Sequence, residues 1–370
     1  MKIALVVYRL GPSHGSILQT YALYQTLYKM GHEVSILNRQ KNLSIYRILR
    51  NIAARIKGRI LNSYKGPVFY TKDYSSLSMR ELNTFVQKYL KSNLLTFSTR
   101  NELNNIINLN FDCYIVGSDQ TWRPKYVHDV KYYFLDFLPI NSSVKRIAYA
   151  PSFGTSNWEF TPQLTEECKK YLSSFSAVSV REDVGVDLCR KFFNVQVSHV
   201  LDPTFLLEQK DYLLLINKTH QESNKILALS ILDNSAFAIE LVQKVCSDLN
   251  LKPCQINASH KSTVKDWIEP GIEKWLEGIL QSKFVVTDSF HATVFAIIFN
   301  KPFITIVNVS RGSSRILSLL TMFGLENRMV DSIDQVSDKL LYDTIDWDAV
   351  NRIIEKERNK SINWLKEALK

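Results

Sequence analysis

Apolar segments of strand length alternate with segments of helical apolar spacing along most of the chain. In the first unit, an apolar run at 2–8 leads through a polar loop to a helical pattern at 17–31 and a second apolar run at 32–38. This order of strand, helix and strand predicts a parallel sheet joined by right-handed crossovers. Because the strand-like runs are mostly apolar rather than alternating, we expect helices on both faces of the sheet.

The same pattern recurs in two blocks, which predicts an α/β fold with two domains facing one another across a cleft. The first block continues with strand-like runs at 111–119, 145–154, 175–183 and 195–207 and a helical pattern at 184–193. The second block has strand-like runs at 224–232, 251–258, 283–289 and 301–308, with helical patterns at 235–250, 271–282 and 290–300.

A proline, a cluster of charges and a change of pattern place the linker between the two blocks near 201–219. We therefore expect an N-terminal Rossmann-like domain at 1–205, a C-terminal Rossmann-like domain at 206–345 and a C-terminal helix at 346–370. The length of 370 residues exceeds one comfortable hydrophobic core, which agrees with two domains.

Composition narrows the class of protein. With 45% hydrophobic and 22% charged residues, the chain has the composition of a soluble globular protein. It contains no run of 18 apolar residues that could span a membrane, and its start is too short for a signal peptide. The five cysteines are odd in number and show no CxxC spacing, which favours reduced, buried thiols in a cytoplasmic protein over disulfides or zinc ligands.

Three polar side chains follow predicted strands, which is where open parallel sheets bind ligands. These residues are Asp119, Arg181 and His291. A carboxylate at such a position is either functional or the cap of a helix. Arg181 either grips a carboxylate or phosphate with its planar guanidinium group or pairs locally with Glu182 or Asp183.

His291 stands between an apolar strand and an apolar helix. At that junction the first helical N–H groups are free and the helix dipole favours anions. An imidazole there suits a general acid or an anion ligand. The alternative is a structural histidine that is hydrogen-bonded to a backbone carbonyl.

A basic segment has no acidic residue between Glu33 and Asp73. Its isoleucines recur at spacings of three or four, which predicts a basic amphipathic helix near 44–62. Three interpretations compete: a solvated helix packed on its own domain, a helix on an anionic membrane surface, and a nucleic-acid-binding helix. No RNA- or DNA-binding motif accompanies it, so we expect no nucleic-acid partner.

Several ordered blocks resemble the polysaccharide pyruvyl transferase family over roughly residues 1–330. They are HGSILQTYALYQTL at 14–27, DCYIVGSDQTW at 112–122, SVREDVGVDLC at 179–189, TDSFHATVFAIIFNKPFI at 287–304 and RGSSRILSLLTMFGLENR at 311–328. The resemblance implies a pair of Rossmann-like domains of the glycosyltransferase-B type. It also implies transfer of a pyruvyl group from phosphoenolpyruvate to a pair of sugar hydroxyls of a surface polysaccharide precursor, such as a capsule or exopolysaccharide unit, to form a ketal.

The resemblance also implies roles for individual residues. The family's donor-binding histidine falls on His291, its arginine falls on Arg181, and Asp119 matches its acidic loop. Catalytic roles are therefore expected for His291 and Asp119. Ser289 stands where many members have an arginine. We expect Ser289 to line the donor site and Arg311 or Arg315 to supply the missing donor-binding cation.

The remaining expectations concern the acceptor, the location and the competing functions. We expect the acceptor side to include Gln19, Ser118, Gln120 and Trp122, and we expect no metal ion and no cofactor beyond the phosphoenolpyruvate donor. If the basic helix lies on a membrane, we expect a lipid-linked saccharide acceptor. We then also expect the protein to be peripheral at the inner face of the membrane. One competing function is a sugar-nucleotide glycosyltransferase with Glu269 or Glu273 on the ribose, and another is a non-catalytic glycan-binding protein.

Overall fold

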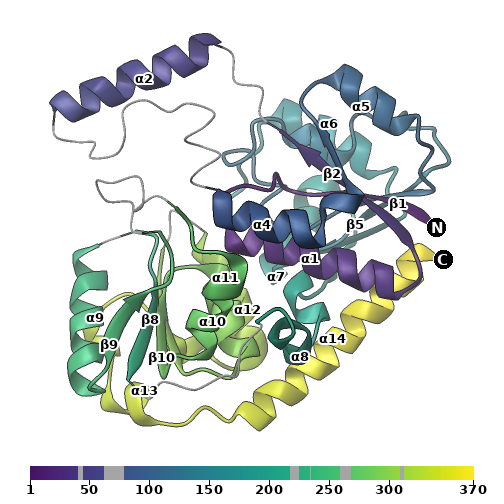
Figure 1. Cartoon of the computed structure of the whole chain (residues 1–370). Coiled ribbons are helices and arrows are strands. Elements are labelled where there is room, and N and C mark those ends of the chain that lie inside the picture. The colour runs from purple at the N-terminus through teal and green to yellow at the C-terminus, as the bar shows by residue number, and fades with distance from the viewer. Residues whose placement is uncertain (41–44, 62–78, 217–224, 234, 259–267, 309–311) are drawn as a thin grey trace.

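The computed structural model describes residues 1–40, 45–61, 79–216, 225–233, 235–258, 268–308 and 312–370, except for the side chains of 45–48 and 51. It contains two parallel sheets with helices around them, which confirms the predicted α/β class (Figure 1). Within these residues, no helix is both long enough and apolar enough to cross a membrane.

The first half of the chain forms a seven-stranded parallel sheet in the order β3-β2-β1-β4-β5-β6-β7. Its strands are β1 (Lys2–Val6), β2 (Glu33–Arg39), β3 (Leu94–Phe97), β4 (Cys113–Val116), β5 (Lys145–Ala148), β6 (Ala177–Val180) and β7 (Ser198–His199). The central strands β1 and β4 are almost completely buried, as their unbroken apolar runs predicted.

Several helices also belong to this half of the chain. They are α1 (His14–Lys29), α2 (Ile45–Ile60), α4 (Arg80–Tyr89), α5 (Arg100–Ile107), α6 (Pro162–Leu172), α7 (Asp183–Leu188) and α8 (Gln209–Leu213). Shorter helical turns are η1 (Lys91–Asn93), η2 (Val130–Phe134), η3 (Cys189–Phe193) and η4 (Pro203–Leu206). In Figure 1, α2 stands apart from the other helices, and α1 lies against the second half of the chain.

The second half forms a five-stranded parallel sheet in the order β12-β11-β10-β8-β9. Its strands are β8 (Ile226–Ser230), β9 (Lys252–Gln255), β10 (Phe284–Thr287), β11 (Phe303–Ile306) and β12 (Met329–Val330). Its helices and turns are α9 (Ala236–Asp248), α10 (Ile272–Leu280), α11 (Phe290–Ile298), α12 (Ser313–Phe323), η7 (Glu326–Arg328), η8 (Ile333–Gln335), α13 (Asp338–Tyr342) and α14 (Trp347–Leu369).

Two helices tie the halves together. From the first half, α1 packs on η4 and also contacts α10 and α11. From the second half, α14 runs back to the first sheet (Figure 1), where Ser361 Oγ accepts a hydrogen bond from the Leu201 N–H at 3.0 Å. One buried apolar cluster therefore continues from Ile17 in the first half to Phe295 in the second. This continuity brings the carboxyl ends of β4 and β6 close to the start of α11.

Two predicted elements differ from the observed ones in kind as well as in bounds. The run at 195–207 was expected to be one strand, but only Ser198–His199 pairs in the sheet and Pro203–Leu206 forms a 3-10 turn. Pro203 has no N–H for a ladder, and Asp202 begins the turn by accepting a hydrogen bond from the Thr204 N–H. The helical pattern at 184–193 becomes α7 followed by the π-helical turn η3.

Candidate functional site

His291 lies in the first turn of α11, directly beyond the carboxyl end of β10. The strand-to-helix turn is held by Thr287, whose Oγ1 accepts a hydrogen bond from the Ser289 N–H at 2.9 Å. Ser289 is the N-cap residue of α11, and its side chain makes no capping bond. The His291 side chain is only 10% exposed, and its Nε2 has no hydrogen-bond partner among the described residues. The nearest carboxylate oxygen, Asp202 Oδ2, lies 3.7 Å from this nitrogen, slightly beyond hydrogen-bond distance.

Arg181 follows β6 and forms an ion pair with a residue distant in sequence. Its Nη1 donates to Asp202 Oδ2 at 2.9 Å, so its partner is neither Glu182 nor Asp183. Burial alone would lower the pKa of Arg181, but the carboxylates of Asp202, Asp119 and Glu182 outweigh it and raise that pKa. Arg181 Nε and Nη2 are buried and have no partner among the described residues. One edge of the guanidinium group is therefore available to an anion.

Asp202 lies between Arg181 and His291. The sequence analysis did not predict it as a site residue. Burial would raise the pKa of its carboxyl, but His291, Arg181 and Thr204 together hold that pKa well below its ordinary value. Its Oδ2 lies 3.7 Å from His291 Nε2, which joins the first half of the chain to the second. Asp202 is therefore an ionised carboxylate between two cationic or protonatable groups.

A glycine of α1 makes room for the imidazole. A Cβ atom added to Gly15 would lie 2.0 Å from His291 Nδ1, far inside van der Waals contact. The first turn of α1 therefore packs directly on the ring, and only glycine fits at this position. The sequence pattern placed residues 14–16 in the loop before the helix at 17–31, whereas in the structure His14 begins α1.

Arg315, in the first turn of α12, supplies a second guanidinium group. Its Cζ lies 5.3 Å from the centre of the Phe290 ring, and the Arg181 Cζ lies 4.5 Å from the same centre. Burial, and then the positive charge of Arg181, lower the pKa of Arg315 to about 10. Two guanidinium groups held this close to one ring create an electropositive site suited to an anion.

Asp119 lies at the carboxyl end of β4, in a backbone conformation that non-glycine residues rarely adopt. Its φ is 88°, and its Oδ1 accepts a hydrogen bond from the Gln120 N–H at 2.8 Å. Such strain, of order 1–3 kcal/mol, concentrates at functional sites. The negative charge of Asp119 helps to raise the pKa of Arg181, and it partly opposes the lowering of the pKa of Arg315. The three side chains therefore interact electrostatically.

The structure places the expected acceptor residues in different environments. Ser118 Oγ lies 3.4 Å from both Asp202 Oδ2 and Arg181 Nη1. Gln19 is buried, and its Oε1 has no partner among the described residues. Gln120 Oε1 already accepts a hydrogen bond from Arg123 Nη1 at 2.9 Å.

Trp122 is instead a core residue. It is fully buried and stacked on Phe134, and its Nε1 donates to the Tyr133 carbonyl oxygen at 3.0 Å. It therefore has no surface with which to contact an acceptor. Arg311 lies outside the described residues.

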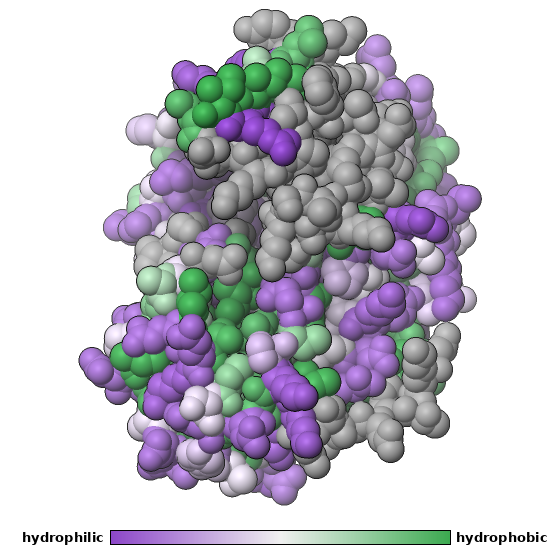
Figure 2. Space-filling model, turned by 60° about the vertical axis from the view of Figure 1, so that its left-hand side comes forward, coloured by the Kyte–Doolittle hydropathy of each residue, from purple (hydrophilic) through white to green (hydrophobic). Residues whose placement is uncertain are grey.

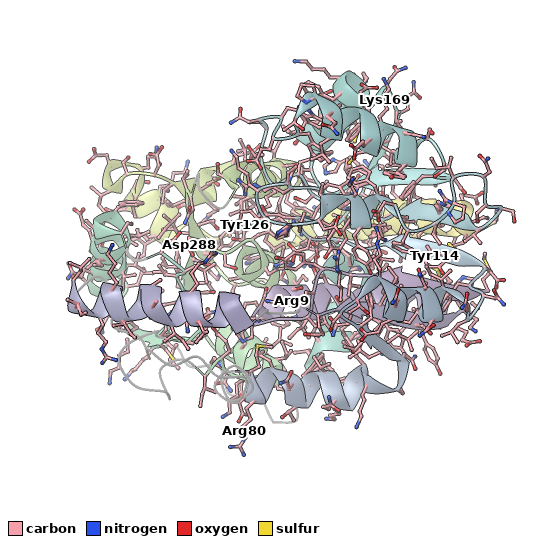
Figure 3. The ribbon with its side chains drawn as sticks, turned by 90° about the horizontal axis from the view of Figure 1, so that it is seen from above. Arg9, Arg80, Tyr114, Tyr126, Lys169 and Asp288 are labelled. Atoms are coloured by element: carbon pink, nitrogen blue, oxygen red, sulfur yellow. The ribbon has the colours of Figure 1, made fainter. Side chains whose placement is uncertain are left out.

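The site lies where the two halves meet. In the view from above, Tyr126 of the first half and Asp288 of the second lie toward the middle of the molecule, whereas Lys169 and Arg80 lie near its edges (Figure 3). Among the described residues, no three histidine, cysteine or carboxylate side chains gather as a metal site.

His14, the neighbour of Gly15 at the start of α1, forms a second contact between the halves. Its Nε2 lies 2.8 Å from the Pro270 carbonyl oxygen, and its ring stacks on Trp275 with centres 5.1 Å apart. Burial lowers the pKa of His14 to about 4. The folded protein therefore holds this imidazole neutral at physiological pH.

We expect His14 to make the stability of the protein fall as the pH is lowered from about 6.5 to about 4. In the unfolded chain the imidazole takes up a proton near pH 6.5, whereas the folded protein resists protonation until about pH 4. The difference corresponds to up to about 3 kcal/mol in the free energy of unfolding. Urea unfolding at a series of pH values should show a shallower decline for His14→Gln. The exposed His128→Gln serves as control, and equal declines in all three proteins would contradict this role for His14.

Comparisons with known proteins agree with this architecture. Residues 14–310 match the family described as polysaccharide pyruvyl transferase. A search of curated proteins found no match.

Solved structures show the fold. The S. aureus MnaA–UDP co-structure is 11% identical with a TM-score of 0.51, and covers 97% of this chain and 91% of its own. A UDP-GlcNAc 2-epimerase from Methanocaldococcus jannaschii is 12% identical with a TM-score of 0.50, and covers 97% and 93%. At these identities the likeness concerns the fold alone, which is the predicted pair of Rossmann-like domains of the glycosyltransferase-B type.

Proposed function

The chain belongs to the polysaccharide pyruvyl transferase family, and from this premise we propose that it transfers the pyruvyl group of phosphoenolpyruvate to a saccharide. Two hydroxyl groups of one sugar would replace the phosphate, giving a cyclic pyruvate ketal and inorganic phosphate. The acceptor would be a precursor of a surface polysaccharide.

The observation that carries this proposal is the incomplete hydrogen bonding of Arg181. Phosphoenolpyruvate has a carboxylate and a phosphate, and a guanidinium edge binds either with two parallel hydrogen bonds. Arg181 Nε and Nη2 form such an edge, are buried, and lack partners among the described residues. Arg315, whose Nε donates to the Gly312 carbonyl oxygen at 3.2 Å, lies on the same aromatic ring and adds a second positive charge beside this edge.

The reaction needs one proton donor and one proton acceptor near the donor carbon. Protonation of the methylene carbon gives a methyl group and an oxocarbenium-like centre, which a sugar hydroxyl attacks with loss of its proton. Phosphate then leaves, and the second hydroxyl closes the ketal with loss of a second proton. We assign the proton donor to His291 and the proton acceptor to Asp119, which come from different halves of the chain. Each transfer would contribute about 10²–10⁴-fold in rate.

A discriminating experiment supplies phosphoenolpyruvate and a saccharide fraction, and measures phosphate release together with the mass of the saccharide. Pyruvyl transfer gives phosphate and a gain of one pyruvate minus one water. Release of nucleotide from a sugar nucleotide would instead support a glycosyltransferase. Of the two carboxylates considered for that function, Glu269 already accepts a hydrogen bond from the Ala258 N–H at 3.1 Å. If neither phosphate nor nucleotide is released, the remaining interpretation is a non-catalytic glycan-binding protein.

We also propose that α2 holds the protein at an anionic lipid surface, where a lipid-linked acceptor would be found. Among the side chains of α2 that the structure describes, three large apolar ones are exposed: Leu49 by 60%, Ile56 by 42% and Ile60 by 78%. Figure 2 shows a hydrophobic strip at the top of the molecule, where α2 lies, with hydrophilic residues beside it. Exposed apolar side chains of this size argue against a helix packed on its own domain.

Charge reversal on α2 tests the lipid surface. Arg50, Lys57 and Arg59 are exposed on this helix. Changing all three to Glu should abolish sedimentation with anionic vesicles, at about 1 kcal/mol for each positive charge lost. Turnover of a soluble acceptor should stay within about twofold of the unchanged protein.

A matched control reverses three exposed lysines of the second half, Lys252, Lys283 and Lys339, which changes the net charge equally. Equal loss of vesicle binding in both variants would mean that net charge, rather than α2, drives the attraction. Unchanged vesicle binding in the α2 variant would remove the lipid surface from the proposal.

A further inference from the structure

The carboxylate of Asp202 is held rigidly at the junction of the two halves. Its Oδ1 accepts two hydrogen bonds from Thr204, one from the backbone N–H at 3.0 Å and one from Oγ1 at 2.7 Å. With Oδ1 fixed in this way, Oδ2 faces Arg181 Nη1 at 2.9 Å and His291 Nε2 at 3.7 Å. The Asp202 side chain is fully buried, so no solvent competes for either oxygen.

The imidazole of His291 is confined from two directions. Asp202 lies on its Nε2 side, and Gly15 of α1 approaches Nδ1 so closely that no side chain fits there. The distance of 3.7 Å is longer than a hydrogen bond, but catalytic hydrogen bonds are often long without substrate and tighten when it binds. An ionised carboxylate facing Nε2 favours a proton on that nitrogen, because a carboxylate can only accept.

We propose that Asp202 is a positioning residue that orients the His291 imidazole and keeps a proton on its Nε2. Asp202 would act on the reaction through His291, without touching the substrate. With one proton held on Nε2, the proton that His291 delivers would be a second one, carried on Nδ1. The effect of Asp202 on catalysis rests on the proposed pyruvyl transfer. Its effect on which nitrogen of His291 carries the proton does not.

A single substitution, read through the tautomer of His291, tests this role. Asp202→Asn replaces one carboxylate oxygen by an NH₂ group, which donates hydrogen bonds and does not accept them. If the amide oxygen stays with the Thr204 N–H, the NH₂ group faces His291. The His291 Nε2 must then accept, and the proton moves to Nδ1.

Nitrogen NMR of ¹⁵N-histidine-labelled protein without substrate reads the tautomer directly. The His291 signals are those missing from His291→Gln, which is feasible with seven histidines in the chain. We expect the form protonated at Nε2 to be the majority in the unchanged protein and the minority in Asp202→Asn. The same tautomer ratio in both proteins would overturn the proposal.

A second variant covers the case in which Asp202→Asn does not fold, because it leaves the buried Arg181 without a charged partner. Thr204→Val removes the Oγ1 hydrogen bond that aims the carboxylate and keeps its charge. It should shift the tautomer ratio in the same direction by a smaller amount. An unchanged ratio in a folded Thr204→Val, with Asp202→Asn unfolded, would count against the proposal.

A double-mutant cycle tests the catalytic consequence. Asp202→Asn should lower kcat at least about tenfold in the unchanged protein and by less than about twofold in the His291→Gln background. An equal loss in both backgrounds would mean that Asp202 acts through Arg181 alone, and would overturn the positioning role. A reversed tautomer in a protein without pyruvyl transfer would preserve the role of Asp202 and reject the proposed function.

Discussion

His291→Ala should lower kcat for pyruvyl transfer by at least about 10²-fold while the protein remains folded. The physical reason is the loss of the proton donor at the start of α11, since a positioned acid contributes about 10²–10⁴-fold. The free energy of unfolding should change by no more than about 0.5–3 kcal/mol, the range of an average substitution. Steady-state release of phosphate from phosphoenolpyruvate, together with urea unfolding of the same preparations, measures both quantities.

His291→Gln separates proton transfer from binding. Glutamine can hydrogen-bond the donor but does not deliver a proton, so the variant should bind phosphoenolpyruvate and still turn over slowly. Thr26→Ala is a control, because Thr26 is a buried polar residue elsewhere on α1 whose Oγ1 donates to the Ala22 carbonyl oxygen at 2.8 Å. Turnover near that of the unchanged protein in His291→Gln would make His291 a binding residue only. Unfolding of His291→Ala, with an active folded fraction, would instead indicate a structural histidine.

Arg181→Lys should raise the KM for phosphoenolpyruvate about tenfold or more. Lysine keeps a positive charge beside Asp202 but loses the planar edge formed by Nε and Nη2. A hydrogen bond to a charged group contributes about 1.5–3 kcal/mol, and 1.4 kcal/mol corresponds to a factor of ten. Initial rates over a range of phosphoenolpyruvate concentrations at a saturating acceptor concentration measure this KM.

The matched control is Arg146→Lys. Arg146 is a fully buried arginine on the neighbouring strand β5, where it contacts Ser174 and the Pro139 carbonyl oxygen away from the site. Its substitution should lower stability and leave the KM for phosphoenolpyruvate unchanged. An unchanged KM in a folded Arg181→Lys would remove Arg181 from the donor site.

The candidate site shows how far strand-end reasoning reaches. Parallel strands place their carboxyl ends at one edge, so Asp119 and Arg181 could be assigned to that edge from the sequence. The same rule applies to Asp202, which follows β7. The expected strand at 195–207 concealed it, because a residue inside a strand is not examined as a strand-end ligand. The proline at 203 was the signal that the strand ends earlier.

Trp122 illustrates the opposite error of reasoning by proximity in sequence. It follows the polar loop that contains Ser118 and Asp119, which suggested a place at the acceptor side. In the structure its ring turns inward and stacks on Phe134. The favourable free energy of burying a large aromatic ring decides its orientation, even beside a polar loop. No local pattern in the sequence indicates which way the ring turns.

The sequence by itself determined the α/β class, the parallel sheets and the amphipathic character of α2, because these depend on apolar periodicity within short segments. It also indicated His291 as a residue between strand and helix. Only the tertiary structure decided that Arg181 pairs with Asp202 and that Asp202 faces His291. It also gave the reason for a glycine at position 15, which is that an imidazole from the other half lies against it. These contacts join residues 21 to 276 positions apart, and such distances are set by the packing of α1 and α11 between the two sheets rather than by any local pattern.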